Sequence, residues 1–226
     1  MYLFLISALP VFLICLFIYK KDKNREPKKL LFKLFFLGML SCIPACFLEI
    51  LCFGNYNPTD MSIGSVFIYS FFGVALIEEL CKFFVTYRVS YNNYEFDEVY
   101  DMIIYATFVS LGFAFLENVC YVSLYGYVTG FLRAILSVPF HACNGIFMGY
   151  YLGIAKTYGI RNNKKEEKNN IMMAIVMAIT THGFYDFCVF SGNLLFFIIF
   201  IIYVIFMYSY CIKRVNNVSN LNERIR

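Results

Sequence analysis

The chain has 226 residues, of which 61% are hydrophobic and only 15% are charged, with a net charge of +4. A soluble globular domain is about half apolar and about a quarter charged, so this composition excludes that class and predicts a polytopic membrane protein. Most of the lysines and arginines lie in short loops between apolar runs, which argues against a nucleic-acid partner.

Seven apolar runs are each long enough to cross a hydrocarbon core of about 30 Å as a helix. In chain order, the predicted spans are 2–19, 31–54, 63–87, 101–124, 128–155, 171–190 and 193–212. The fifth is the longest, and we expect it to be tilted or to continue past the bilayer. The fold class is therefore an all-α transmembrane helix bundle. Because the loops are short, we expect one membrane-embedded domain over residues 1–226.

The basic residues of the loops alternate between the two sides of this bundle. The first, third and fifth loops and the C-terminal tail carry them, whereas the second, fourth and sixth loops carry none. The positive-inside rule then places the N-terminus outside and the C-terminus in the cytoplasm. Basic residues follow the first apolar run instead of preceding it, so we expect a retained helix and no cleaved signal peptide.

Several ionisable side chains lie inside the predicted spans, where an isolated Asp, Lys or Arg costs about 2.5–3.5 kcal/mol on insertion scales. We therefore expect them to face the bundle interior, pair with one another or line a wet cavity. Both histidines of the chain belong to this set, which favours function over a structural role. The set is Glu49, Glu78, Glu79, Lys82, Glu117, Arg133, His141, His182 and Asp186.

Helical spacing predicts which of these groups share a face. Glu78 and Lys82 are four residues apart and are expected to pair. Glu79 projects about 100° away from Glu78 and is expected to serve a different partner. His182 and Asp186 are also four residues apart, and a carboxylate in that position can orient an imidazole.

The same residues are expected to meet in one polar cavity formed by the third to sixth spans. Counted at about 1.5 Å per helical residue, Glu78, Glu117, His141 and His182 all fall near the middle of the bilayer. Pro139 precedes His141 and is expected to free a backbone carbonyl and bend its helix.

Such a cavity supports hydrolysis in two ways. A buried carboxylate can take a proton from water while histidine or asparagine donates to a developing oxyanion. Alternatively, two histidines and a glutamate can hold Zn²⁺ with a second glutamate as base. The HExxH signature is absent from the chain, so a zinc site would be assembled from separate helices.

Four motifs, all within residues 75–186, carry a family resemblance. "EELCK" fits EExxK, "FAFLEN" fits FxxxEN, and "HACNG" and "HGFYD" supply two separated histidines, the second as HxxxD. In this order over successive spans, they resemble the PrsW family of bacterial intramembrane proteases. They are also similar to motifs of the CAAX-prenyl endoproteases, of their bacteriocin-processing relatives and of a non-catalytic subunit of gamma-secretase.

The resemblance implies a multi-pass protease of the bacterial cell membrane. Its substrate would be a single-span anti-sigma factor, cut first near the membrane surface, before a second intramembrane protease completes release of a sigma factor. The implied partners are this membrane protein and lipid, with no nucleic acid.

The resemblance also assigns residues. The catalytic set is Glu78, Glu79, Glu117, His141 and His182, and the supporting set is Lys82, Asn118 and Asp186. PrsW proteins are commonly labelled metalloproteases, whereas the related prenyl endoproteases look glutamate-dependent, so zinc and metal-free chemistry both stay open.

Our mechanistic hypothesis gives each residue a role. Glu78 or Glu79 activates water with His141. His182, held by Asp186, stabilises the oxyanion together with Asn118. Glu117 orients water or joins His141 and His182 as a metal ligand, and Lys82 keeps Glu78 ionised.

The two remaining charges receive a simpler interpretation. Glu49 is expected near the outer end of its helix, facing a wet vestibule. Arg133 is expected near the outer surface, where its long side chain can reach the interface or bind a substrate carbonyl or carboxylate.

Two rival functions use the same polar cavity. One is a proton-coupled carrier, since intramembrane Glu, His and Lys also form proton relays; the chain shows no internal repeat of broken helices to support it. The other is a non-catalytic scaffold that binds transmembrane helices. Glu78→Gln separates the three, because only a protease loses cleavage while still binding its substrate.

Overall fold

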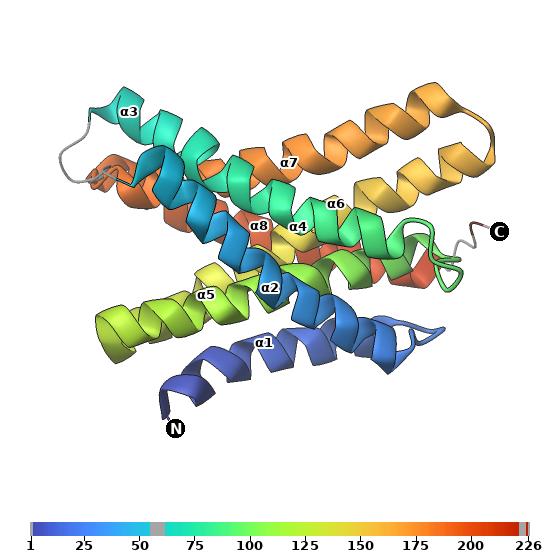
Figure 1. Cartoon of the computed structure of the whole chain (residues 1–226), viewed down its shortest axis with the longest axis horizontal. Coiled ribbons are helices and arrows are strands. Elements are labelled where there is room, and N and C mark those ends of the chain that lie inside the picture. Colours follow the sequence, from blue (N-terminus) through green and yellow to red (C-terminus); the bar gives the residue numbers. More distant parts are fainter. Residues whose placement is uncertain (1, 55–61, 222–224, 226) are drawn as a thin grey trace.

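The computed structural model describes residues 2–54, 62–221 and 225, and over this part of the chain it is helical with no strand. The all-α prediction is confirmed (Figure 1). Two basic tail residues used for the orientation, Arg224 and Arg226, lie outside the described residues. The elements are α1 (Tyr2–Lys21), α2 (Lys28–Phe53), α3 (Ile63–Ile68), the π-helix η2 (Tyr69–Ala75), α4 (Leu76–Ser90), α5 (Val99–Ile135), α6 (Ser137–Ile160), α7 (Lys164–Phe190) and α8 (Leu194–Leu221).

Five helical stretches among the described residues are long and apolar enough to cross a membrane. They are Lys28–Phe53, Ile63–Ser90, Val99–Ile135, Lys164–Phe190 and Leu194–Leu221. The predicted first and fifth spans, which correspond to α1 and α6, are not among them. The count of seven spans and the orientation of the two ends stay predictions.

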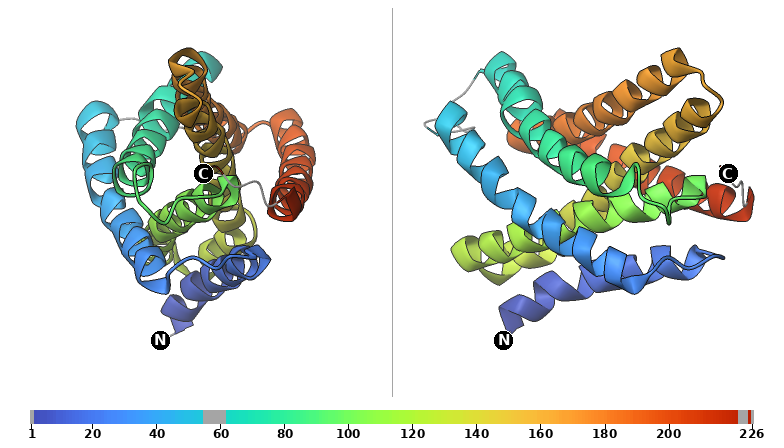
Figure 2. Two further views of the ribbon diagram at one scale, coloured as in Figure 1. Left: turned by 90° about the vertical axis from the view of Figure 1, so that its right-hand side faces the viewer. Right: turned by 45° about the vertical axis from the view of Figure 1, so that its right-hand side comes forward.

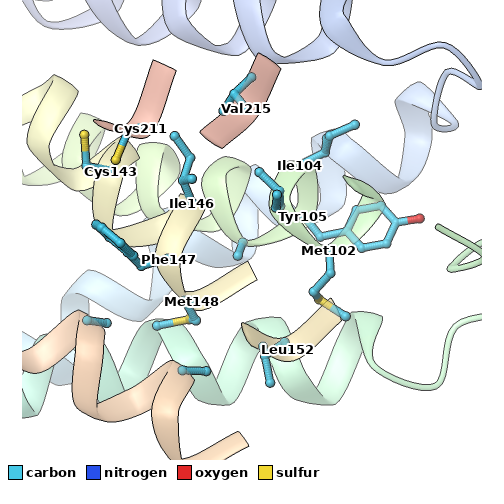
Figure 3. Packing of buried hydrophobic residues seen from close by; sticks show 14 of the residues in the cluster. Met102, Ile104, Tyr105, Cys143, Ile146, Phe147, Met148, Leu152, Cys211 and Val215 are labelled. Atoms are coloured by element: carbon cyan, nitrogen blue, oxygen red, sulfur yellow. The ribbon is translucent and has the colours of Figure 1, made fainter. Parts of the chain in front are cut away.

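The core of the bundle lies where α5 and α6 pack against each other and against α8. Figure 3 shows the apolar side chains that meet there, among them Tyr105 of α5, Phe147 of α6 and Val215 of α8. The backbones of α5 and α6 approach closely because small residues line the contact. A Cβ on Gly149 would lie only 2.4 Å from the Met102 carbonyl oxygen.

The junction between α5 and α6 differs from the prediction. A span was expected to begin at residue 128, but α6 begins at Ser137, and residues 127–135 belong to α5. In place of the expected loop, α5 contains one residue with non-helical backbone angles, Gly126, whose φ is 84° and ψ is −171°. A positive φ of this size is readily adopted only by glycine, so this residue permits the chain to change direction.

Pro139 explains why α6 begins where it does. It is the third residue of α6, within the first turn, where backbone N–H groups lack helical partners and a proline is tolerated. Its missing N–H leaves the carbonyl of Ile135 free, as the sequence predicts. The Tyr208 hydroxyl of α8 donates to that oxygen at 3.0 Å and to the Leu136 carbonyl at 2.6 Å.

The long element Ile63–Ser90 changes its winding just before its charged residues. Residues Tyr69–Ala75 form the π-helix η2, and α4 follows without a gap. Segments of π-helix are rare and often occur at functional sites. The wider turns pack on α7 at Gly183, where an added Cβ would lie 2.6 Å from the Phe71 ring.

The helices around α4 determine which side chains can meet. The helix contacts α2, α5 and α7, and α6 and α7 form an antiparallel hairpin (Figures 1 and 2). The polar face of α4 is therefore turned toward the middle parts of α5, α6 and α7.

Candidate active site

Four helices bring their polar residues to one place in the bundle. The α4 helix contributes Glu78, Glu79 and Lys82, α5 contributes Glu117 and Arg133, α6 contributes His141, and α7 contributes His182 and Asp186. Their carboxylate, amine, guanidinium and imidazole groups form a connected network of contacts. The predicted shared cavity between the third and sixth spans thus corresponds to a buried cluster, which we call the polar cluster.

Lys82 lies at the centre of the polar cluster. Its Nζ donates to Glu78 Oε2 at 2.8 Å and to Glu79 Oε1 at 2.9 Å, and it lies 3.2 Å from His141 Nδ1. The side chain is fully buried, and its Nζ stands 4.1 Å from the centroid of the Phe113 ring. The predicted Glu78–Lys82 pair is therefore present, and Glu79 shares the same lysine.

The contacts of His141 specify its tautomer. An ammonium can only donate, so Nδ1 of His141 accepts from Lys82, and the ring proton belongs on Nε2. Nε2 lies 2.9 Å from Glu117 Oε2. Glu117, His141 and Lys82 consequently form a continuous chain of contacts from α5 through α6 to α4.

His182 is held by Glu79 more closely than by Asp186. Its Nδ1 lies 2.7 Å from Glu79 Oε1, whereas its Nε2 lies 3.4 Å from Asp186 Oδ2 and 4.0 Å from Glu78 Oε2. The orienting partner expected at Asp186 is thus supplied mainly by Glu79. Since neither contact of Nε2 is a short hydrogen bond, that nitrogen stays available to another group.

Arg133 is largely buried against Glu117, a contact that the sequence did not predict, whereas its depth relative to the membrane surface stays a prediction. Its guanidinium is 2.8 Å from Glu117 Oε2 and 4.0 Å above the Tyr121 ring, and its side chain is only 16% exposed. The physical reason is the change of direction at Gly126, which brings residues 127–135 back over Glu117. The sequence held one signal for this change of direction, since Gly126 and Pro139 flank residues 127–135.

Two further polar side chains at the site lack partners among the described residues. Asn118 is fully buried, and neither atom of its amide makes a hydrogen bond. The buried Oε1 of Glu49 also has no hydrogen-bond partner in that part of the chain. Glu49 lies on α2, which packs against α4.

The donor atoms of the polar cluster are of the kind that hold a metal ion. Glu78, Glu79, His141 and His182 each place one ligand atom within 4.8 Å of the others, and imidazole and carboxylate are usual zinc ligands. The predicted trio of Glu117, His141 and His182 is not this group, because Glu117 is taken by Arg133 and lies on the far side of His141.

The arrangement, however, does not fit a metal ion as it stands. Lys82 already bonds to three of the four residues, Glu78, Glu79 and His141, so a buried cation holds these groups together. The lysine ammonium therefore occupies the place that a metal ion would need.

Carboxylates and imidazoles gathered in the interior of an apolar helix bundle are the arrangement expected of an intramembrane hydrolase. The model for "PrsW family intramembrane metalloprotease" matches residues 26–211. The chain belongs to the PrsW family and is an intramembrane protease of the multi-pass bacterial membrane type.

Curated relatives support this assignment over nearly the whole chain. The chain is 39% identical to Protease PrsW of Oceanobacillus iheyensis, over 94% of this chain and 95% of that one. It is 35% identical to Protease PrsW of Bacillus subtilis over 76% and 75% of the two chains. The match to the Clostridioides difficile protein is 28% over 99% and 94%. No solved structure matches the chain significantly.

Proposed function

We propose that this protease cuts a single-span membrane protein of the anti-sigma-factor type, as the first of two cleavages that release a sigma factor. The observation that carries the proposal is the position of Glu78 beside His182, in a polar cluster enclosed by apolar helices. A substrate that crosses the membrane once can present its peptide backbone to such a site from within the bilayer.

The contacts favour Glu78 over Glu79 as the base that activates water. Glu79 is fully buried, and its Oε1 is held by both Lys82 and His182. Glu78 retains 4% exposure and pairs through Oε2 with Lys82. Glu79 is thus suited to position the other groups, while Glu78 is suited to accept a proton.

The proposed reaction proceeds through a tetrahedral intermediate. Glu78 takes a proton from water as the water oxygen attacks the carbonyl carbon, and the same proton then passes to the leaving amine. His182 acts as an imidazolium: its Nδ1–H donates to Glu79, and its Nε2–H donates to the developing oxyanion. Asn118, with its unpartnered amide, is proposed as the second donor.

The remaining residues act through these groups. Glu117 and Arg133 form an ion pair that fixes His141, and His141 in turn fixes Lys82. Glu79 binds Nδ1 of His182, and Asp186 is the carboxylate nearest to Nε2, the other ring nitrogen.

A cleavage assay with purified protein tests the proposal. The chain is incubated in detergent with a tagged single-span anti-sigma factor from the same genome, and a shortened product is sought. Glu78→Gln should bind the substrate but yield far less product than wild type. Glu166→Gln, which makes the same change at the loop end of α7, should cut at the wild-type rate.

The rival functions give different results in the same assay. Substrate that stays intact and co-purifies equally with wild type and Glu78→Gln would support a scaffold. Cleavage retained in Glu78→Gln would overturn the assignment of the base.

A further inference from the structure

Lys82 and a metal ion would need the same place in the polar cluster. Around a tetrahedral zinc, nitrogen and oxygen ligands lie about 2.0–2.2 Å from the ion and so about 3.3–3.6 Å from one another. Glu78, Glu79, His141 and His182 can approach that spacing with small movements, since their ligand atoms lie within 4.8 Å. A positively charged group must now hold the carboxylates of Glu78 and Glu79 together there.

The ammonium of Lys82 is that group. It has three N–H donors, and three acceptors surround it: Glu78 Oε2 at 2.8 Å, Glu79 Oε1 at 2.9 Å and His141 Nδ1 at 3.2 Å. All the donors of the lysine are thus matched, and the face of the Phe113 ring lies 4.1 Å from Nζ.

Burial makes this arrangement specific. Glu79 and Lys82 have no exposed surface and Glu78 has 4%, so bulk water cannot screen their charges. A divalent ion bound to the same residues would be forced into contact with an ammonium of like charge. Metal binding therefore requires Lys82 to leave the cluster or to lose its proton.

We propose that Lys82 is the resident cation of this site: its ammonium holds Glu78, Glu79 and His141 where a divalent metal would otherwise bind, so that lysine and metal compete. The inference deepens the proposed function, on which it rests, because these residues are also the proposed catalytic set. It predicts that the wild-type chain binds zinc weakly and that removing the lysine creates a metal site.

Metal binding itself provides the test, independently of cleavage. Wild-type protein and Lys82→Leu are freed of metal with a chelator and then titrated in detergent with Zn²⁺, with bound metal measured by mass spectrometry. Leucine is apolar and shorter than lysine, so it leaves the position of Nζ empty. Co²⁺ replaces Zn²⁺ in a parallel titration, because its visible absorption reports tetrahedral coordination.

The expected result is tighter binding in the variant. If the ammonium leaves the cluster in fewer than about one molecule in ten, its removal strengthens the apparent zinc affinity at least about tenfold. Arg88→Leu is the matched control, since it removes one exposed positive charge in the last turn of the same helix. Adding His182→Ala to Lys82→Leu should abolish the gained affinity.

Each other outcome overturns the proposal. One tightly bound zinc per wild-type chain would show that lysine and metal coexist, and this result needs no variant to fold. A folded Lys82→Leu protein that binds no more zinc than wild type would show that the lysine displaces nothing. Because no substrate is present, failure of the proposed cleavage reaction and failure of this inference are separate results.

Discussion

Glu79→Gln is expected to destabilise the folded protein more than Glu78→Gln, although both replace a carboxylate in the same turn of α4. Glu79 binds two partners through charge-assisted contacts, Lys82 at 2.9 Å and His182 at 2.7 Å. Glu78 has one such contact, to Lys82 at 2.8 Å, and a distance of 4.0 Å to His182. The two variants therefore separate a positioning role from a catalytic one.

The magnitudes follow from these contacts. A hydrogen bond to a charged group contributes about 1.5–3 kcal/mol, and removal of one partner from a buried ion pair costs about 3–5 kcal/mol. We expect Glu79→Gln to lower the free energy of unfolding by about 3–5 kcal/mol and Glu78→Gln by about half as much. For a chain of this size, each 1 kcal/mol lowers the melting temperature by about 2–4 °C.

Two measurements in the same detergent test this difference. Thermal unfolding followed by circular dichroism should rank wild type above Glu78→Gln and Glu78→Gln above Glu79→Gln. Cleavage by folded Glu78→Gln should fall by about 10²–10⁴, the usual contribution of a general base. The reasoning is refuted if Glu78→Gln melts at or below the temperature of Glu79→Gln, or if it retains wild-type cleavage while folded.

Three further predictions concern packing, the helix junction and pH. Gly149→Ala should lower the free energy of unfolding by about 1–3 kcal/mol because its Cβ would meet a backbone oxygen at 2.4 Å, whereas Gly64→Ala, with open space around it, should not; equal melting temperatures would contradict the close approach of α5 and α6. Tyr208→Phe should cost about 1–3 kcal/mol in urea unfolding, because the Ile135 carbonyl, which Pro139 leaves without a helical donor, loses the Tyr208 hydroxyl, and an unchanged midpoint would argue against this contact. Burial raises the pKa of Glu26 in the loop before α2 to about 7, so its stabilising contribution is complete below its unfolded value of about 4.5 and is lost as pH rises through 7. The melting temperature of wild type should therefore fall more than that of Glu26→Gln between these pH values, and parallel profiles would exclude this role for Glu26.

The spacing of residues within one helix was a sound guide to local pairs. Glu78 and Lys82 meet because residues four apart share a helical face. The same rule placed Glu79 with a different partner, and it does bind His182, but it also shares Lys82. A long lysine side chain can reach carboxylates three and four residues before it, so the two glutamates are less separate than their angular offset suggests.

The position of Arg133 could not be predicted from the spacing of residues within one helix. An arginine near the end of an apolar run is expected to extend toward water, and Gly126 and Pro139 on either side of it indicate a change of chain direction but not the partner. The backbone at Gly126 turns the segment back, so that Arg133 faces Glu117 across the turn. Such a contact depends on the two backbone dihedral angles of one residue, which composition and periodicity do not report.

The sequence by itself determined the class of this protein, its all-α fold and the identity of the polar residues. These follow from a simple physical fact: charges in an apolar medium are too costly to leave isolated, so a few Glu, His and Lys residues in long apolar runs must gather in the interior. Only the tertiary structure decided how they gather. His182 and Glu79 are 103 residues apart, and His141 and Lys82 are 59 residues apart. Which nitrogen meets which oxygen over such separations is set by how α4, α6 and α7 pack, and that packing placed a lysine ammonium, flanked by two carboxylates and an imidazole, at the centre of the cluster.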